Sequence, residues 1–328
     1  MHGRYLTDSN PLSKKNVNNI HQFIMNLKPI NLHLDSVTMA DIENHKLISD
    51  VELNRDISNI LKFPATTNQN SFAGNPFLYH HQFKNLLKCS RSDGKTIYDI
   101  HNDPDKWSKL IDSTRKRNRG GRTAAGNVYE CFRINLGSVV MFKATTAKYL
   151  YKKYNAKSVL DPTAGWGGRM LGAWALGINY TGIDTNVEMI PAYDSMMNYL
   201  KQYNNNTFHT DSNLTMLWQS CLDVNFENIE YDFVLTSPPY VNLEIYEHMD
   251  VWDSDRAFYD NFFLPLWHKC MDNIKVNGTI CFNISPKMYD AALTHGLEPC
   301  HDEEDLKQQL GQQTGKKKQD KIYIWTKS

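Results

Sequence analysis

The chain has 328 residues, 41% of them hydrophobic, which suffices for one large domain or two smaller ones. Its 36 basic and 36 acidic side chains balance, which excludes attraction of nucleic acid by overall charge and leaves only a local basic surface for that purpose. No stretch approaches the roughly 20 apolar residues of a membrane-spanning helix, so we expect a soluble, intracellular protein without membrane contact.

The six cysteines also bear on the class of protein. They form no Cys-x-x-Cys pair, and no histidines lie at the spacing of a zinc site. We therefore predict no metal site and expect reduced, mostly buried thiols.

The first part of the chain, residues 1–112, is rich in Asn and His. Its helical patterns include "NVNNIHQFIMNL" (16–27) and "PFLYHHQFKNLLK" (76–88), and the polar stretch "PATTNQNSFAGNP" (64–76) interrupts them. Apolar residues at helical spacing followed by Gly- and Pro-containing breaks are typical of short helices. We interpret residues 1–112 as a mainly helical accessory or target-recognition domain.

A basic, Gly-containing connector is predicted over residues 113–135. Within it, "STRKRNRGGRTAAGN" (113–127) places a cluster of basic side chains around a glycine pair. Such a stretch is typical of a solvated loop, but it also suits contact with nucleic-acid phosphates. The candidate nucleic-acid-binding residues are Arg115, Lys116, Arg117, Arg119 and Arg122.

Residues 136–328 alternate between short apolar runs and helix-length segments, which predicts an α/β fold with a largely parallel sheet. The expected strands are "KSVLD" (157–161), "YTGID" (180–184), "TMLWQS" (215–220), "YDFVLTS" (231–237), "GTICFNIS" (278–285) and "KIYIWTK" (321–327). We expect the last of these to run antiparallel to the others. Residues 301–320 are predicted to be a solvated helix and loop, with Lys316, Lys317 and Lys318 as an alternative phosphate contact.

A glycine turn, "DPTAGWGG" (161–168), follows the first of these strands. Its spacing differs from the dinucleotide fingerprint and no lysine follows it, so the pocket suits a ligand without a pyrophosphate. Asp184 ends the second strand, where an acid either accepts ribose hydroxyls or caps the next helix.

The segment "TSPPY" (236–240) ends the fourth strand. A proline has no backbone donor and cannot continue a central strand, so the chain must leave the sheet in a rigid loop. Loops beyond the carboxyl ends of strands are where open α/β sheets bind ligands.

The segments "DPTAGWGG", "GIDTN" and "TSPPY" together resemble the S-adenosylmethionine-dependent amino-methyltransferases, and most closely those that methylate N4 of cytosine in DNA. The resemblance covers residues 136–328 and implies a seven-stranded Rossmann-like methyltransferase sheet, S-adenosyl-L-methionine as cofactor and DNA as partner. It implies that the exocyclic amine of a flipped base meets the catalytic loop, which is formed by Ser237, Pro238, Pro239 and Tyr240.

The resemblance also implies a cofactor site, with the glycine turn at the methionine part and Asp184 at the ribose. The candidate residues are Phe142, Lys143, Thr145, Asp161, Pro162, Ala164, Gly165, Gly167, Gly168, Asp184, Ser220 and Cys221. For "SVVMFKATTAKYL" (138–150), the start of a packed amphipathic helix fits as well.

Three alternatives stay open for the function. Many N4-cytosine enzymes place the Ser-Pro-Pro-Tyr segment before the glycine turn, whereas here the glycine turn comes first. N6 of adenine in DNA and a base amine in RNA are therefore competing targets. A non-catalytic binding subunit with the same fold is the third alternative.

Overall fold

Seven strands form one mixed sheet in the computed structural model, which describes residues 33–66, 71–91, 95–117, 122–136, 139–207, 212–239, 244–245, 252–305 and 320–328. The strand order is β4-β3-β2-β5-β7-β9-β8. The strands are β2 (Ser158–Asp161), β3 (Asn179–Asp184), β4 (Leu214–Trp218), β5 (Phe233–Thr236), β7 (Thr279–Ile284), β8 (Asp302–Asp305) and β9 (Lys321–Thr326). Strands β4, β3, β2, β5 and β7 are parallel, and β9 is antiparallel to β7. The predicted seven-stranded Rossmann-like sheet with an antiparallel last strand is confirmed.

The central strands are apolar because both faces of the sheet are covered. Along β5, Phe233 and Leu235 pack into one hydrophobic core and Val234 packs into the other. The first core contains helices α8 (Ala144–Lys153), α9 (Gly168–Trp174) and α10 (Ile190–Thr207). The second contains α11 (Asp255–Phe258), the π-helix η4 (Tyr259–Phe263), α12 (Leu264–Asn273) and α13 (Pro286–Thr294). Two 3-10 turns, η2 (Val187–Met189) and η3 (Phe226–Asn228), lie in the connections.

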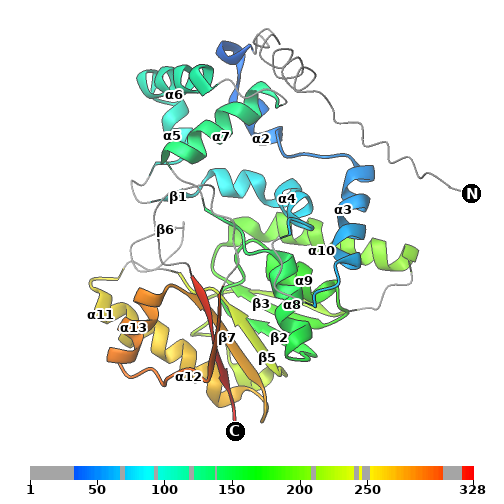
Figure 1. Ribbon diagram of the computed structural model, residues 1–328, viewed down its shortest axis with the longest axis vertical. Coiled ribbons are helices and arrows are strands. Elements are labelled where there is room, and N and C mark those ends of the chain that lie inside the picture. The colour runs from blue at the N-terminus through cyan, green and yellow to red at the C-terminus, as the bar shows by residue number, and fades with distance from the viewer. Residues whose placement is uncertain are drawn as a thin grey trace, which may run out of the picture.

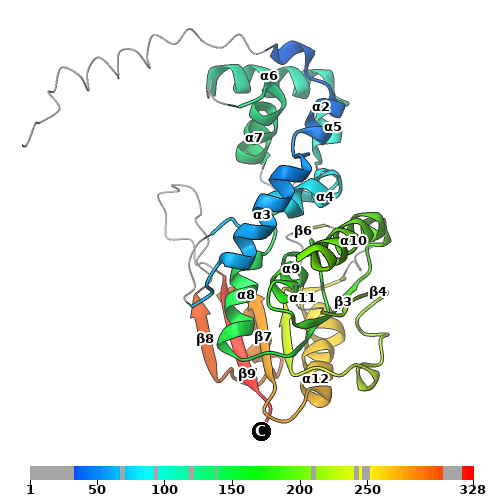
Figure 2. The same cartoon turned by 90° about the vertical axis from the view of Figure 1, so that its right-hand side faces the viewer.

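The described part of residues 33–136 is mainly helical. Its elements are η1 (Leu34–Ser36), α2 (Met39–Asn44), α3 (Asp50–Lys62), α4 (Asn75–Leu87), β1 (Ser90–Arg91), α5 (Ile97–His101), α6 (Pro104–Arg117) and α7 (Ala124–Leu136). Figures 1 and 2 show α2, α5, α6 and α7 grouped at the end of the molecule opposite the carboxyl terminus, with α3 and α4 between this group and the sheet. A third core, which includes Phe83 of α4, holds the group together.

Helices α3 and α4 are attached firmly to the sheet-bearing part of the chain. Leu53, Ile57 and Phe77 belong to the same core as α8, α9 and α10. The Lys148 side chain on α8 is 4% exposed, and its Nζ donates to carbonyls at the end of α3, with 2.8 Å to the oxygen of Ile60. A cation at this position also interacts favourably with the negative, carboxyl-terminal end of the α3 dipole. The division of the chain near residue 112 stays a prediction.

A second contact links the N-terminal helices to the predicted catalytic loop. Strand β6 (Glu244–Ile245) follows that loop in the chain and pairs antiparallel with β1, between α4 and α5. The helical region is therefore joined by backbone hydrogen bonds to the segment that follows the predicted catalytic loop.

Two expectations about local structure are wrong. Residues 113–117 belong to α6 and residues 124–127 to α7, instead of the expected loop. The basic side chains Arg115, Lys116 and Arg117 occupy the last turn of α6, where a positive charge interacts favourably with the helix dipole. Residues 302–305 form β8 instead of a solvated helix: they are an acidic edge strand whose pairing with β9 depends on the backbone and leaves no apolar pattern. Arg119 and Lys316 to Lys318 lie outside the described residues.

None of the helices in the described ranges is both long and apolar enough to span a bilayer.

Candidate functional site

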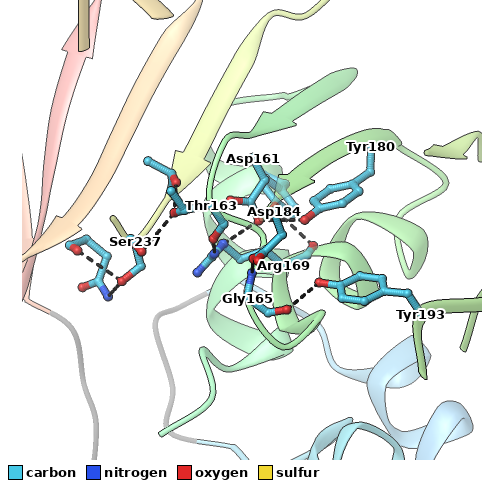
Figure 3. Close-up of polar contacts among 11 residues, drawn as sticks. Asp161, Thr163, Gly165, Arg169, Tyr180, Asp184, Tyr193 and Ser237 are labelled. Atoms are coloured by element: carbon cyan, nitrogen blue, oxygen red, sulfur yellow. Dashed lines mark hydrogen bonds and ion pairs between the residues drawn. The ribbon is translucent and has the colours of Figure 1, made fainter. Parts of the chain in front are cut away.

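The glycine turn and the Pro-Pro loop meet at the carboxyl edge of the sheet, because β2 and β5 are neighbouring parallel strands. The hydroxyl of Thr163, in the glycine turn, lies 2.6 Å from the Thr236 hydroxyl and donates to the Ser237 carbonyl at 3.0 Å. Since the Thr163 proton goes to Ser237, Thr236 must be the donor between the two hydroxyls. Figure 3 shows Thr163 between the two loops. One side chain therefore fixes the relative position of both predicted motifs.

Several hydrogen bonds hold the backbone of the glycine turn in place (Figure 3). The Gly165 N–H donates to Asp184 Oδ2 at 2.8 Å, and its carbonyl accepts from the Tyr193 hydroxyl at 2.8 Å. The Ala164 N–H donates to the Ile183 carbonyl at 2.8 Å. A turn held at this many points is preorganised, so a ligand meets a rigid backbone.

Glycine is required in the turn for two different reasons. Gly165 has φ of 59°, a left-handed conformation that glycine adopts without strain, and a Cβ added there would meet no heavy atom closer than 3.8 Å. At Gly168 a Cβ would lie 1.9 Å from the Phe142 carbonyl oxygen. Gly168 thus allows close packing of α9, whereas at the half-buried Gly165 the left-handed backbone conformation is what favours glycine.

Asp161 carries a buried charge at the base of the turn. It is 0% exposed, and its Oδ2 accepts from Arg169 Nε at 2.6 Å and from the Tyr180 hydroxyl at 2.7 Å. Its Oδ1 is buried and has no hydrogen-bond partner among the described residues. Arg169 also donates to the Thr163 carbonyl. A buried ion pair therefore shapes the turn and leaves one carboxylate oxygen for a further donor.

Asp184 is half-buried, and each of its carboxylate oxygens accepts one backbone N–H, from Gly165 at 2.8 Å and from Asn186 at 3.0 Å. Burial raises its pKa to about 6, although both hydrogen bonds oppose the shift. The alternative of a helix cap is wrong for Asp184, because the side chain that caps η2 is that of Asn186. Each oxygen of Asp184 retains a lone pair for a hydroxyl group.

The Pro-Pro loop presents Ser237 beside β7. Ser237 and Pro239 are half-buried and Pro238 is buried. Asn283 Nδ2 donates to the Ser237 Oγ at 3.1 Å, and that hydroxyl faces the Asn283 carbonyl at 3.4 Å. Tyr240 lies outside the described residues.

The segment before α8 lies against the glycine turn through Phe142, whose ring faces the Arg169 guanidinium at 5.3 Å. The Thr145 hydroxyl donates to the Ser71 carbonyl at 3.2 Å, which ties α8 to the loop before α4. Lys143 is 7% exposed, and burial lowers its pKa. The helix starts at Ala144, so the packed-helix interpretation holds from there on. A cofactor contact by these three side chains stays a prediction.

The candidates after β4 have different surroundings. The Ser220 hydroxyl accepts from the Leu222 N–H at 3.3 Å. Cys221 is 5% exposed within the second core, where burial raises the pKa of its thiol to about 12. Pro162 is buried directly after β2. An adenine contact by Ser220 or Cys221 stays a prediction.

The basic residues differ in how far their charges are paired. Arg115 forms ion pairs with Asp112 at 2.6 Å and with Asp35 at 2.9 Å, and Arg122 pairs with Glu130. Lys116 and Arg117 are exposed at the end of α6. Of this group, they are the better candidates for contact with phosphates.

Sequence reasoning missed four side chains that organise the site. Thr163, Arg169, Tyr193 and Asn283 all act on residues that the motifs do identify. Asn283 left one signal, because it is a polar residue near the carboxyl end of the otherwise apolar run "GTICFNIS". Tyr193 left none, since its pattern is that of an ordinary helix residue.

No protein-family profile and no curated protein sequence matches the chain. Solved structures with a similar fold include a methyltransferase dependent on S-adenosylmethionine from Clostridium acetobutylicum, with a TM-score of 0.39, 10% identity, and coverage of 62% of this chain and 98% of that one. An rRNA methylase from Streptococcus thermophilus has a TM-score of 0.34 and 12% identity, over 58% of this chain and 98% of that one. An RNA methyltransferase from Salinibacter ruber in complex with S-adenosyl-L-homocysteine has a TM-score of 0.33 and 9% identity, over 57% and 93%. At these identities the likeness concerns the fold alone.

Proposed function

We propose that the protein transfers a methyl group from S-adenosyl-L-methionine to the exocyclic amine of a flipped nucleic-acid base, with N4 of cytosine in DNA as the target. The observation that carries this proposal is the Thr163 hydroxyl, which bridges the glycine turn and the Ser237 carbonyl at 3.0 Å. The turn that we propose to hold the cofactor and a loop of hydrogen-bond acceptors are thereby fixed next to each other, as transfer between two bound molecules requires.

The residues around the glycine turn fit this cofactor. The half-buried Gly165 has no side chain to keep a ligand from the backbone of the turn, Asp184 has lone pairs for ribose hydroxyls, and the unpartnered Oδ1 of Asp161 suits the ammonium group of an amino-acid moiety. None of them provides the lysine that a pyrophosphate site would use. When bound, the cofactor supplies an electrophilic methyl group on a sulfonium centre.

The loop at Ser237 supplies the other half of the chemistry. The lone pair of an exocyclic base amine is delocalised into the ring, so the amine is a weak nucleophile. We propose that the Ser237 Oγ and the Pro238 carbonyl accept its two N–H groups and favour a tetrahedral nitrogen. The prolines hold these acceptors rigidly, and Tyr240 supplies a stacking surface worth about 1–3 kcal/mol for the flipped base.

Nucleic acid must approach this edge despite the zero net charge of the chain. We propose that Lys116 and Arg117 at the end of α6 contact phosphates, because they are exposed, whereas Arg115 and Arg122 form ion pairs. Backbone contacts of this kind position the protein without reading the sequence.

Two measurements on the purified protein test the proposal. Calorimetry should detect binding of S-adenosyl-L-methionine and no binding of NAD. The Asp184→Ala variant should bind S-adenosyl-L-methionine more weakly than the wild-type protein. Incubation with methyl-labelled cofactor and either DNA or RNA should then label cytosine in DNA. Label in adenine or in RNA would change the assigned substrate, and no transfer to any nucleic acid, with cofactor bound, would favour a non-catalytic binding subunit.

A further inference from the structure

We propose that Asn283 is a positioning residue that turns the Ser237 hydroxyl into an acceptor for the substrate amine; this rests on the proposed function. Asn283 lies on β7, which is hydrogen-bonded to β5 in the sheet. It is 6% exposed, and its Nδ2 donates to the Ser237 Oγ at 3.1 Å. The backbone carbonyl oxygen of Asn283 lies 3.4 Å from the same Oγ.

The two contacts determine which way the hydroxyl points. A serine hydroxyl has one proton and two lone pairs. The Asn283 side-chain amide donates to one lone pair, and the Asn283 backbone carbonyl is the acceptor for the proton. One lone pair remains, and it is free to accept an N–H of the base amine. Without the Asn283 side-chain amide, only the longer 3.4 Å contact to the backbone carbonyl orients the hydroxyl. Its proton can then turn toward the amine for part of the time, which opposes the required geometry.

The surroundings of Asn283 argue against a purely structural role. Its neighbours along β7, Phe282 and Ile284, belong to the second core, so Asn283 faces the other side of the sheet together with Cys281, a member of the first core. Its Oδ1 is buried without a partner among the described residues. An amide with one unsatisfied oxygen on an apolar face of the sheet lowers the stability of the folded protein. We therefore assign its role to the contact with Ser237.

A matched pair of substitutions isolates the hydrogen bond from the shape of the side chain. Asn283→Asp keeps a hydrogen bond to the Ser237 Oγ in either protonation state, as an acceptor when ionised and as a donor when protonated. Asn283→Leu has a similar volume and makes no hydrogen bond. We expect Asn283→Leu to lower kcat by about 10-fold, the size expected for one lost neutral hydrogen bond. Asn283→Asp should retain most of the activity, and the KM for the cofactor should be unchanged in both.

A double-mutant cycle shows whether the effect passes through Ser237. In a Ser237→Ala background, Asn283→Leu should cause no further loss of kcat. A urea unfolding cycle on the same four proteins measures the coupling between the two side chains without reference to activity. Unchanged kcat in Asn283→Leu, equal loss in Asn283→Asp, or additive losses with Ser237→Ala would each overturn the proposal.

Failure of the proposed function has a different signature. In that case the wild-type protein transfers no methyl group to nucleic acid, and the role proposed for Asn283 fails with it even if unfolding shows coupling. If the wild-type protein is active and only the Asn283 variants behave unexpectedly, the error lies in the role of Asn283 alone.

Discussion

Replacing Thr163 with Val tests whether one hydroxyl holds the two loops of the site together. The change keeps the shape of the side chain and removes the bonds of Thr163 to the Thr236 hydroxyl and the Ser237 carbonyl. Two lost hydrogen bonds cost about 1–3 kcal/mol, and Thr236, which is 0% exposed, is left with a buried hydroxyl. We expect the free energy of unfolding to fall by about 2 kcal/mol, a sizeable share of the 5–15 kcal/mol typical of a folded protein.

Urea unfolding at equilibrium measures this change, with Thr163→Ser as the control because it retains the hydroxyl. The double variant Thr163→Val with Thr236→Val should recover part of the loss, since both buried hydroxyls of the pair are then removed. Methyl transfer should fall in Thr163→Val, because the Ser237 carbonyl loses the bond that holds it. If Thr163→Val and Thr163→Ser unfold within about 0.5 kcal/mol of each other and are equally active, the two loops are not coupled as described.

Three further predictions concern the reaction, the cofactor and the nucleic acid. Ser237→Ala should leave cofactor affinity nearly unchanged and lower turnover by about 10²–10³, as expected when a preorganised polar contact at the reacting centre is lost; normal turnover would mean that the loop is only a turn. Since the pKa of Asp184 is raised to about 6, its carboxylate is protonated as the pH falls through that value. Calorimetry should show cofactor affinity weakening below that pH, by at most about tenfold per pH unit, and a pH-independent affinity in Asp184→Asn; an equally steep wild-type and variant profile would contradict this. Changing Lys116 and Arg117 to Ala should reduce the slope of log affinity for duplex DNA against log salt concentration by roughly 0.9 for each lost phosphate contact. Arg115→Ala should change this slope little, because Arg115 is already paired with Asp35 and Asp112. Equal slopes in all variants would place the DNA contact elsewhere.

The sheet could be predicted from the sequence because its central strands are buried on both faces. Runs such as "YDFVLTS" and "GTICFNIS" are apolar for this reason, and both became strands. Strand β8 could not be predicted in this way, since it is an acidic edge strand that pairs with β9 through its backbone and carries no apolar alternation. Pairing of this kind depends on where β9 lies, which local pattern does not encode.

The motifs of the candidate site were visible, but the contacts that organise them were not. Asp161, Gly165 and Ser237 belong to recognisable segments, whereas Asn283 reaches Ser237 from 46 positions further along the chain. The attachment of α3 was equally hidden, because Lys148 bonds to a carbonyl 88 positions before it. Both contacts follow from how neighbouring elements pack, so they depend on the fold, and the only local signal was the polar Asn283 in an otherwise apolar run.

The central claim is methyl transfer to a base amine at Ser237, and nucleoside mass spectrometry of host DNA tests it most directly. DNA is taken from cells that express the wild-type chain and from cells that express Ser237→Ala at the same level. We expect N4-methylcytosine in the first sample and none above background in the second. No methylated base in either sample, or the same amount in both, would contradict it.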